Sequence, residues 1–438
     1  MISERVISTA LGVLNHRHLA FKPCSIDALP FPQNQQEYVL YVHVPFCEHL
    51  CTRCSRNRFV QREDRAREYF RRLREEMYLV ADLGYDFVSL DVGGGTSQIL
   101  LGELVQTIEV ARRLFPGIRN VSVEASPDHL GDEIVEALSG HVDRLSCSVE
   151  SFDREILRQV DRCGTWGMSV NVLDRLAETV GRFPSFGINM VFNFPNQTEE
   201  LLLRDVDMVK QIGPDSATFY PLMSSNLAPA QLDDESDSID YDREASYYHL
   251  ITSTLADELE PVSAWTYAQR ARGSTEQCSD CLEYVGMGSG AVSFLDGKLY
   301  GNTVSLAEYG HRIDHGQMAV VKCSERYNLF ARMRYRFVMD LFGLRLNKAR
   351  FREDFGVPVE MALPAEIAFL SAVGGIAKNT AEEITLTDHG RYLVLVMMRE
   401  TLTSGNDARD QARAPVPLGE RMRLLHSDDS SAPELAPE

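Results

Sequence analysis

The sequence predicts an α/β protein, built as a partial barrel of six β/α units, (β/α)6, followed by a smaller C-terminal α+β accessory domain. Short β-branched and apolar segments alternate with segments of helical periodicity between residues 38 and 222. This alternation is typical of a parallel sheet with helical crossovers. It stops after about residue 230, where glycine-punctuated and amphipathic segments follow. Six units are too few to close an eight-unit barrel, so we expect the barrel to be open.

The expected strands are short and rich in β-branched or aromatic residues. They cover residues 38–44, 87–92, 119–125, 144–150, 187–194 and 216–222. Apolar side chains at helical spacing predict helices between these strands. The helices cover residues 64–83, 100–115, 130–140, 153–181 and 198–212. Because the carboxyl ends of parallel strands meet at one edge of the sheet, we expect the functional site to lie there.

The chain divides into four predicted regions. They are an N-terminal extension over 1–36, a core domain over 37–230, an accessory domain over 231–400 and a largely disordered tail over 401–438. The tail is predicted to be disordered because it is acidic and poor in large apolar residues. Within the accessory domain we expect a glycine-punctuated β element, two amphipathic helices, and a final strand, turn and helix. These cover residues 286–303, 325–343, 363–378 and 384–400.

Composition limits the classes of function. The 438 residues are 44% hydrophobic and 25% charged, as in an ordinary globular protein. No apolar run is long enough to cross a membrane, and the N-terminus lacks the pattern of a signal peptide. The formal net charge of −20 disfavours a nucleic acid partner, because phosphate backbones carry the same sign. We therefore expect a cytoplasmic protein that acts on a small molecule.

Three cysteines lie close together, at Cys47, Cys51 and Cys54, with the spacing C-x3-C-x2-C. The total of nine cysteines is odd, which argues against a disulfide framework and predicts that the isolated ones are small buried side chains. Three thiolates make a poor structural zinc site, although His43, His49 or a distant cysteine could supply a fourth ligand. The spacing fits better a 4Fe–4S cluster in which one iron stays open to a small molecule.

The segment YVHVPFCEHLCTRC, residues 41–54, resembles the signature of radical S-adenosylmethionine (SAM) enzymes. It is most similar to the subgroup typified by oxygen-independent coproporphyrinogen III oxidase. Further segments match that subgroup in order: GGGT (93–96), VSVEASPDHL (121–130), RLSCSVESF (144–152), VDR (160–162), NMVFNFPNQT (189–198) and YVGMGSGAVSFLDGKLY (284–300). The resemblance covers about residues 38–310 and implies a partial, TIM-like radical SAM barrel.

The resemblance implies roles for individual residues. The three cysteines would ligate the 4Fe–4S cluster, and one SAM molecule would bind the open iron. The strand-end segment Gly93, Gly94, Gly95 and Thr96 would lie along that SAM, although a lone GGG is more often a tight turn. A second SAM would be bound by Glu124, Glu150, Arg162 and Asn189. Tyr41, His43 and Glu150 are the candidate catalytic residues, and for Tyr41 and His43 ordinary core packing is the alternative.

Several residues depart from the subgroup's usual pattern. Arg53 stands in place of an aromatic residue, Ser97 in place of proline, Glu150 in place of glutamine and Asn189 in place of aspartate. Segments CSRNRF (54–59), LGYDF (83–87), FNFP (192–195) and VMMRE (396–400) resemble class C radical SAM methyltransferases. That resemblance implies that one SAM is cleaved to a 5′-deoxyadenosyl radical and that the second supplies a methylene radical. The radical would add to an sp2 carbon of a conjugated small molecule in natural-product or quinone biosynthesis, and give a methyl or cyclopropane product.

Other functions stay open at this point. They are an oxygen-independent coproporphyrinogen III oxidase, a non-catalytic heme chaperone of the same family, and a degenerate member without activity. A catalytic member would need an electron donor such as flavodoxin or ferredoxin. The pair Cys278 and Cys281 is interpreted as a loop pair rather than a second metal site. Trp265, Tyr267 and Tyr284 could line a pocket for a flat substrate, but core packing is the commoner role for aromatic side chains.

Overall fold

The computed structural model describes most of the chain. It covers residue 4 and residues 20–24, 26, 28–33, 36–48, 54, 56–159, 171–223, 240–269 and 283–413. Every structural statement below concerns these residues.

Six parallel strands form the centre of the fold, as the sequence predicts. They are β2 (Val39–Val44), β5 (Ser89–Gly94), β6 (Asn120–Ala125), β7 (Arg144–Glu150), β8 (Ser185–Phe192) and β9 (Ser216–Pro221). Each strand pairs in parallel with the next in this order. The mixed α/β architecture with a central parallel sheet is therefore confirmed.

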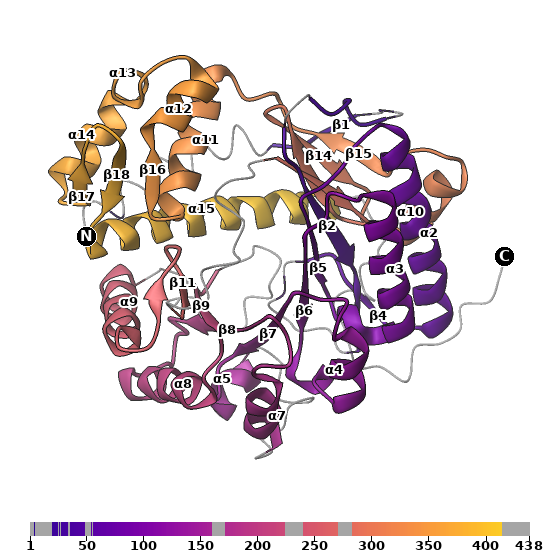
Figure 1. Cartoon of the computed structure of the whole chain (residues 1–438), viewed down its shortest axis with the longest axis horizontal. Coiled ribbons are helices and arrows are strands. Elements are labelled where there is room, and N and C mark those ends of the chain that lie inside the picture. The colour runs from indigo at the N-terminus through magenta and orange to yellow at the C-terminus, as the bar shows by residue number, and fades with distance from the viewer. Residues whose placement is uncertain are drawn as a thin grey trace.

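Helices form an outer layer on one side of these strands (Figure 1). They are α2 (Glu63–Asp82), α3 (Leu101–Leu114), α4 (Asp132–Leu138), α5 (Arg154–Gln159), α7 (Asn171–Thr179) and α8 (Glu199–Ile212). Short 3-10 turns, η1 (Ser97–Leu100) and η2 (Pro127–His129), follow β5 and β6. The long helix predicted over 153–181 corresponds to α5 and α7, and residues 160–170 between them lie outside the described residues.

Local sequence explains where these helices begin, end and pack. Thr198 caps the start of α8 by accepting a hydrogen bond from the Leu201 amide, and Gly213 ends it in the left-handed conformation, with φ +66°. Helix α2 buries Phe70, Leu73, Met77 and Val80, which follow helical spacing. Burying each such side chain contributes about 1.5–3 kcal/mol, so tertiary packing stabilises the helix more than its propensity does.

The sheet continues on both sides of the six strands, to thirteen strands in all. On one side β12 (Tyr284–Met287) lies parallel to β2, and an antiparallel series follows with β13 (Val292–Leu295), β14 (Lys298–Asn302), β15 (Val320–Cys323) and β1 (Lys22–Pro23). On the other side β11 (Thr266–Ala268) and β10 (Glu260–Pro261) extend β9. The glycine-punctuated β element expected over 286–303 is thus present, and its first strand joins the core sheet.

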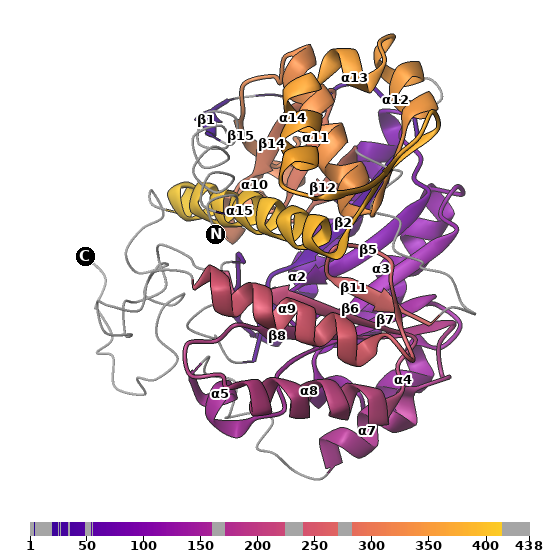
Figure 2. The ribbon, with the colours of Figure 1, turned by 90° about the vertical axis from the view of Figure 1, so that its left-hand side faces the viewer.

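The remaining C-terminal elements are mostly helical. They are α9 (Tyr241–Leu255), α10 (Leu306–Asp314), α11 (Leu329–Phe342), α12 (Lys348–Phe355), α13 (Val359–Ala362), α14 (Pro364–Ala372) and α15 (Asp388–Arg413), with a small sheet of β16 (Arg345–Asn347), β17 (Ile376–Asn379) and β18 (Glu383–Leu386). Helix α15 lies between α9 and the group formed by α11 to α14 (Figures 1 and 2).

Two boundaries differ from the sequence prediction. The helix expected over 363–378 ends at Ala372, because Gly374 adopts the left-handed conformation, with φ +71°, and β17 begins at Ile376. The last helix continues to Arg413, into the region expected to be a disordered tail.

Two isolated cysteines are joined, contrary to the expectation that they are separate buried thiols. Cys24, directly after the edge strand β1, forms a disulfide with Cys323 of the neighbouring strand β15, although 299 positions separate them in the sequence. Their contact depends on strand pairing that no local pattern encodes. None of the described helices is both long and apolar enough to cross a membrane.

Candidate functional site

The glycines at the end of β5 form a ledge against which three predicted site residues lie. A Cβ at Gly93 would lie 2.8 Å from the Glu124 carboxylate, and one at Gly94 would lie 2.7 Å from the His43 ring. A Cβ at Gly95 would lie 2.8 Å from the Cys47 sulfur and would overlap the Phe46 carbonyl. Gly94 also has φ +122°, which side-chain-bearing residues rarely adopt. Glycine is therefore required at these positions because the neighbouring residues leave no room for a side chain, and not only because the chain turns there.

The cysteine loop is attached to this ledge. A short pair of parallel strands, β3 (Phe46–Cys47) and β4 (Phe59–Val60), closes the loop at its base. The Thr96 amide donates to the Phe46 carbonyl at 2.7 Å, and the Gly95 amide donates to the Val44 carbonyl at 2.7 Å. These bonds fix the start of the loop beside the ledge.

Cys47 and Cys54 are partly exposed. Cys51 lies outside the described residues, and the part of the chain that the structure describes holds no group of three His, Cys, Asp or Glu side chains arranged for a metal. The two described thiols still fit an iron–sulfur cluster by their chemistry, because thiolates are the usual ligands of such clusters. Gly95 lies directly against Cys47, since a Cβ at Gly95 would be 2.8 Å from the Cys47 sulfur.

Tyr41 and His43 form a hydrogen-bonded pair that ends at the cysteine loop. The Tyr41 hydroxyl lies 3.0 Å from His43 Nδ1, and His43 Nε2 lies 2.8 Å from the Asn57 carbonyl. A carbonyl only accepts, so Nε2 carries the proton and, in the neutral ring, Nδ1 accepts from Tyr41. Both ring nitrogens are thus occupied, so His43 is not a fourth metal ligand in this arrangement.

Glu124, the penultimate residue of β6, forms an ion pair with Arg56, whose Nη1 lies 2.6 Å from Glu124 Oε2. Burial tends to raise the pKa of Glu124, but the Arg56 guanidinium and a hydrogen bond from the Gly94 backbone lower the pKa below its ordinary value. Glu124 is therefore a carboxylate at neutral pH. Arg56 lies two positions after Cys54, so this pair joins the cysteine loop to the third strand of the parallel sheet.

The sheet face that carries these residues is polar over several strands. Tyr41, Asp91, Ser122 and Arg144 occupy neighbouring register positions on β2, β5, β6 and β7, and each is partly exposed. Buried parallel strands usually carry apolar side chains on both faces. Burial raises the pKa of Asp91 to about 6, although the charge of Arg144 opposes that shift. A polar, solvent-reached face of this kind suits a polar cofactor or substrate.

Glu150 ends β7 in the left-handed conformation, with φ +69°. Such a conformation is uncommon for a residue with a side chain and is often found at functional sites. The two residues that follow hold it in place: the Ser151 hydroxyl donates to Asp205 at 2.8 Å, and the Phe152 amide donates to Asp205 at 2.7 Å. Burial raises the pKa of Asp205 to about 7. Asn189 lies opposite Ser148 on the neighbouring strand, near this end of the sheet.

Ser97, which replaces the proline typical of the subgroup, has a structural role. Its hydroxyl donates to the Glu124 carbonyl at 2.8 Å, and the Gln98 amide donates to the same carbonyl at 2.7 Å. The serine therefore helps to fix the end of β6, which proline could not do because it has no hydroxyl.

Several sequence-predicted residues lie outside the described residues or away from the site. Cys51, Arg53, Arg162 and the pair Cys278 and Cys281 belong to the first group. Trp265 and Tyr267 are buried in the core, where Trp265 packs edge-on against Phe342 at 4.6 Å. The sequence reasoning missed Arg56 and Asn57, although both lie in the CSRNRF segment directly after the last cysteine.

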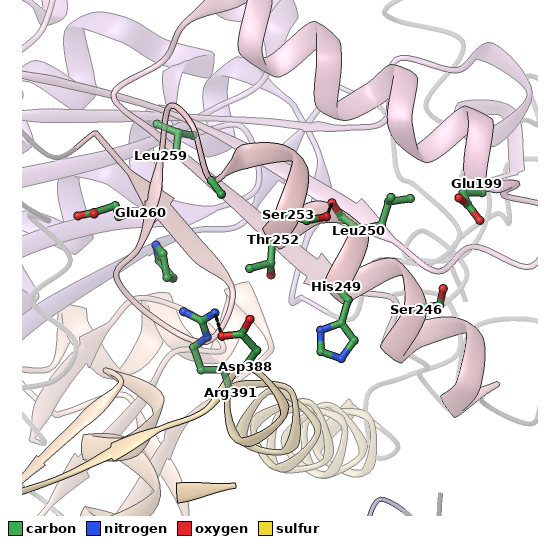
Figure 3. A pocket seen from close by; sticks show the side chains of 12 residues that line it. Glu199, Ser246, His249, Leu250, Thr252, Ser253, Leu259, Glu260, Asp388 and Arg391 are labelled. Atoms are coloured by element: carbon green, nitrogen blue, oxygen red, sulfur yellow. Dashed lines mark hydrogen bonds and ion pairs between the residues drawn. The ribbon is translucent and has the colours of Figure 1, made fainter. Parts of the chain in front are cut away.

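A separate pocket of about 610 Å³ lies beside α9 and the start of α15. Figure 3 shows His249 from α9 and Arg391 from α15 pointing toward the same space. Arg391 pairs with Asp388 at 2.6 Å, and Glu199 and Glu260 also line the pocket. It contains none of the predicted site residues, so it is not the site described above.

Comparison with known proteins agrees with the cysteine loop and the ledge. The sequence model of the radical SAM superfamily matches residues 41–209, which span β2 to α8. Residues 41–209 are similar to this superfamily, and they make up less than half of the chain. The likeness points to a 4Fe–4S cluster and SAM, and the positions of Cys47 and Cys54 beside the glycine ledge agree with it.

Relatives match well beyond that segment. The chain is 24% identical to the heme chaperone HemW of Bacillus subtilis over 383 residues, which is 81% of this chain and 96% of the chaperone. It is 25% identical to the oxygen-independent coproporphyrinogen III oxidase of Pseudomonas aeruginosa over 391 residues, which is 81% of this chain and 83% of the oxidase. The solved structure of coproporphyrinogen III oxidase (HemN) from Escherichia coli has the same fold, with a TM-score of 0.67, 19% identity, and coverage of 90% of this chain and 93% of that one.

These relatives overturn the expected methyltransferase function. The similar proteins are named as heme chaperones and coproporphyrinogen oxidases, and their likeness extends over most of their length. The short segments that suggested a methyltransferase include VMMRE, whose Arg399 is a buried partner of Glu244 between α15 and α9. A structural ion pair explains that arginine without any role in methyl transfer.

Proposed function

We propose that this protein is a radical SAM heme chaperone, which holds a 4Fe–4S cluster and SAM and binds heme for delivery to an acceptor protein. The observation that carries the proposal is the likeness to the Bacillus subtilis heme chaperone over 96% of that protein's length. The alignment is long enough to include accessory elements as well as the radical SAM segment. Strand β12 joins part of that accessory region to the core sheet through β2.

The residues of the site have defined roles under this proposal. Cys47, Cys51 and Cys54 would hold the cluster, and the ledge from Gly93 to Thr96 would lie along the SAM. A second SAM would be held by Glu124, Glu150, Arg162 and Asn189. In a catalytic member, the cluster would supply the electron for reductive cleavage of SAM, and a donor such as flavodoxin or ferredoxin would be needed. Tyr41 and His43 border this space as a hydrogen-bonded pair.

Heme titration of the reconstituted protein tests the proposal. We expect stoichiometric heme binding by absorbance spectroscopy in anaerobic buffer, and transfer of that heme to an apo-cytochrome acceptor. The Cys54→Ala variant, which loses a cluster ligand, shows whether transfer depends on the cluster. Failure of the intact, cluster-loaded protein to bind heme would overturn the chaperone proposal.

A second candidate is an oxygen-independent coproporphyrinogen III oxidase. It is favoured by the left-handed conformation of Glu150, which Asp205 helps to maintain. Backbone strain of this kind is typical of catalytic sites, and a passive carrier has less need of it. Incubation of the reduced protein with SAM and coproporphyrinogen III, followed by mass spectrometry, distinguishes the two. Consumption of the porphyrinogen together with formation of 5′-deoxyadenosine would support the oxidase instead of the chaperone.

A further inference from the structure

We infer that Asn57 is a positioning residue through which a distant glycine loop holds the cysteine loop in place. Asn57 follows Cys54 by three positions and is 3% exposed. The glycine loop covers residues 286–290, at the end of β12, and its Ser289 is separated from Asn57 by 232 positions. The inference concerns the cluster and does not depend on the choice between chaperone and oxidase.

The side-chain N–H₂ group of Asn57 shares its two hydrogens among three acceptors of the far segment. Its Nδ2 donates to the Ser289 carbonyl at 3.2 Å, to the Ser289 hydroxyl at 3.1 Å and to the Val304 carbonyl at 3.3 Å. A short neutral side chain with an N–H₂ group suits this position, because all three partners can accept. Gly290 adopts φ +79°, and a Cβ there would lie 2.5 Å from Asn57 Cβ. The hydrogen bonds therefore need the Asn57 amide, and the close approach of the two segments needs glycine at position 290.

The glycine loop is itself a rigid support. The Ser289 hydroxyl donates to the Thr303 carbonyl at 3.0 Å, and the Ser289 amide donates to the Tyr69 hydroxyl at 3.0 Å. The Gly288 amide donates at 2.8 Å to Glu76, a fully buried side chain of α2. Because both ends of this support are buried in the core, it can restrain Asn57 without moving itself.

Asn57 restrains the site in two ways. Through the backbone, it fixes the position of the chain that directly follows Cys54. Through its carbonyl it accepts from His43 Nε2 at 2.8 Å, and His43 in turn accepts from Tyr41 at 3.0 Å. A shift of Asn57 would therefore move a cluster ligand and the Tyr41–His43 pair together. Groups that orient metal ligands in this indirect way commonly change metal affinity by about 10–100-fold when they are removed.

The test compares Asn57→Ala and Ser289→Ala with a control, Asn328→Ala, in the full-length protein after anaerobic cluster reconstitution. Asn328 caps α11 by accepting from the Ala331 amide and lies far along the chain from the cysteine loop. Two readouts are used besides melting temperature: the rate of iron release to a chelator, and the electron paramagnetic resonance (EPR) spectrum of the reduced cluster with and without SAM. Neither readout needs heme or turnover.

We expect Asn57→Ala to remain folded, to release iron at least about 10-fold faster than the parent protein, and to show an altered EPR response to SAM. Ser289→Ala, which removes one of the three acceptors, should change both readouts in the same direction by a smaller factor. Asn328→Ala should lower the melting temperature without changing either readout. Parent-like iron release and EPR spectra in folded Asn57→Ala would overturn the inference. If that variant does not fold, parent-like readouts in Ser289→Ala would do so.

Discussion

Gly95 lies against the cysteine loop because it has no side chain. Replacing it with alanine would place a Cβ over the Phe46 carbonyl and 2.8 Å from the Cys47 sulfur. We expect Gly95→Ala to fold but to retain less than about a tenth of the parent's iron, as loss of an orienting group does at metal sites. Iron analysis after reconstitution measures this.

The control for that change is Gly102→Ala, in the first turns of α3. An added Cβ at Gly102 meets nothing within 4 Å, and alanine favours a helix over glycine by up to about 1 kcal/mol. This variant should keep its iron and melt at the same or a higher temperature. Equal iron contents in the two variants would contradict the proposed contact between the ledge and the cysteine loop.

Glu76 predicts a pH dependence of stability. Burial raises the pKa of Glu76 from the ordinary 4.5 to about 7. Hydrogen bonds from Tyr309, the Gly288 amide and Asn302 lower the pKa, but by less than burial raises it. Glu76 therefore binds a proton more tightly in the folded state than in the unfolded state. The stabilisation that results is complete below pH 4.5 and is lost as the pH rises to about 7. The loss amounts to roughly 3 kcal/mol.

Denaturant unfolding of the parent and of Glu76→Gln at several pH values between 5 and 8 measures this effect. The variant cannot titrate at this position, so the difference between the two stability curves should change by roughly that amount across the range. The neighbouring Glu75→Gln, which changes a half-exposed side chain paired with Arg71, is the control. Parallel curves for the parent and Glu76→Gln would show that Glu76 does not titrate as inferred.

At the scale of secondary-structure elements, a buried ion pair joins α15 to α9. Arg399 is 1% exposed and pairs with Glu244, which is fully buried and also accepts from the Tyr392 hydroxyl. Arg399→Met would leave the Glu244 carboxylate buried without its cation. We expect the free energy of unfolding to fall by roughly 3–5 kcal/mol, measured by denaturant unfolding.

Adding Glu244→Gln to Arg399→Met should restore part of that loss, because the double variant leaves no unpaired charge. As a control, Arg158→Met removes an exposed pair with Glu155 within α5, and it should not change stability measurably because water screens exposed pairs. A similar stability for Arg399→Met and the parent would mean that the ion pair does not hold the two helices together.

At the scale of the whole molecule, the thirteen-stranded sheet of the described residues brings β1, near the N-terminus, beside β15, about 300 positions later in the chain. At this outermost pair of strands, Cys24 and Cys323 form the disulfide. In protein that is denatured without reductant, we expect Cys24 and Cys323 to be protected from alkylation. The thiol of Cys147, which is buried in the folded state, should be labelled under the same conditions. Peptide mass spectrometry with and without reductant measures the difference, and labelling of Cys24 and Cys323 without reductant would contradict it.

Loss of this link should also affect stability. The disulfide closes a loop across 299 positions, and removing such a link lowers the free energy of unfolding by about 2–4 kcal/mol. The Cys24→Ser, Cys323→Ser double variant should show this loss in oxidising buffer and match the reduced parent protein. In a reducing compartment the two residues are expected to be thiols.

Local sequence patterns predicted the alternation of strands and helices and the position of the cysteine loop after the first core strand. They did so because period-2 and period-3.6 patterns are local properties, as is the spacing C-x3-C-x2-C. Most predicted strands are within two residues of those observed, such as residues 144–150 for β7 (Arg144–Glu150). The helix expected over 363–378 was wrong beyond Ala372 because apolar residues continued past the glycines that end α14.

Contacts between residues far apart in the sequence depend on the tertiary structure. It placed β12 beside β2, Arg56 against Glu124, Ser289 against Asn57 and Cys24 against Cys323. None of these partners is indicated by its neighbours in the sequence, because each contact depends on how remote strands line up in one sheet. The function also required information beyond local motifs, since short matches suggested a methyltransferase and likeness over most of the chain pointed to heme chaperones and coproporphyrinogen oxidases.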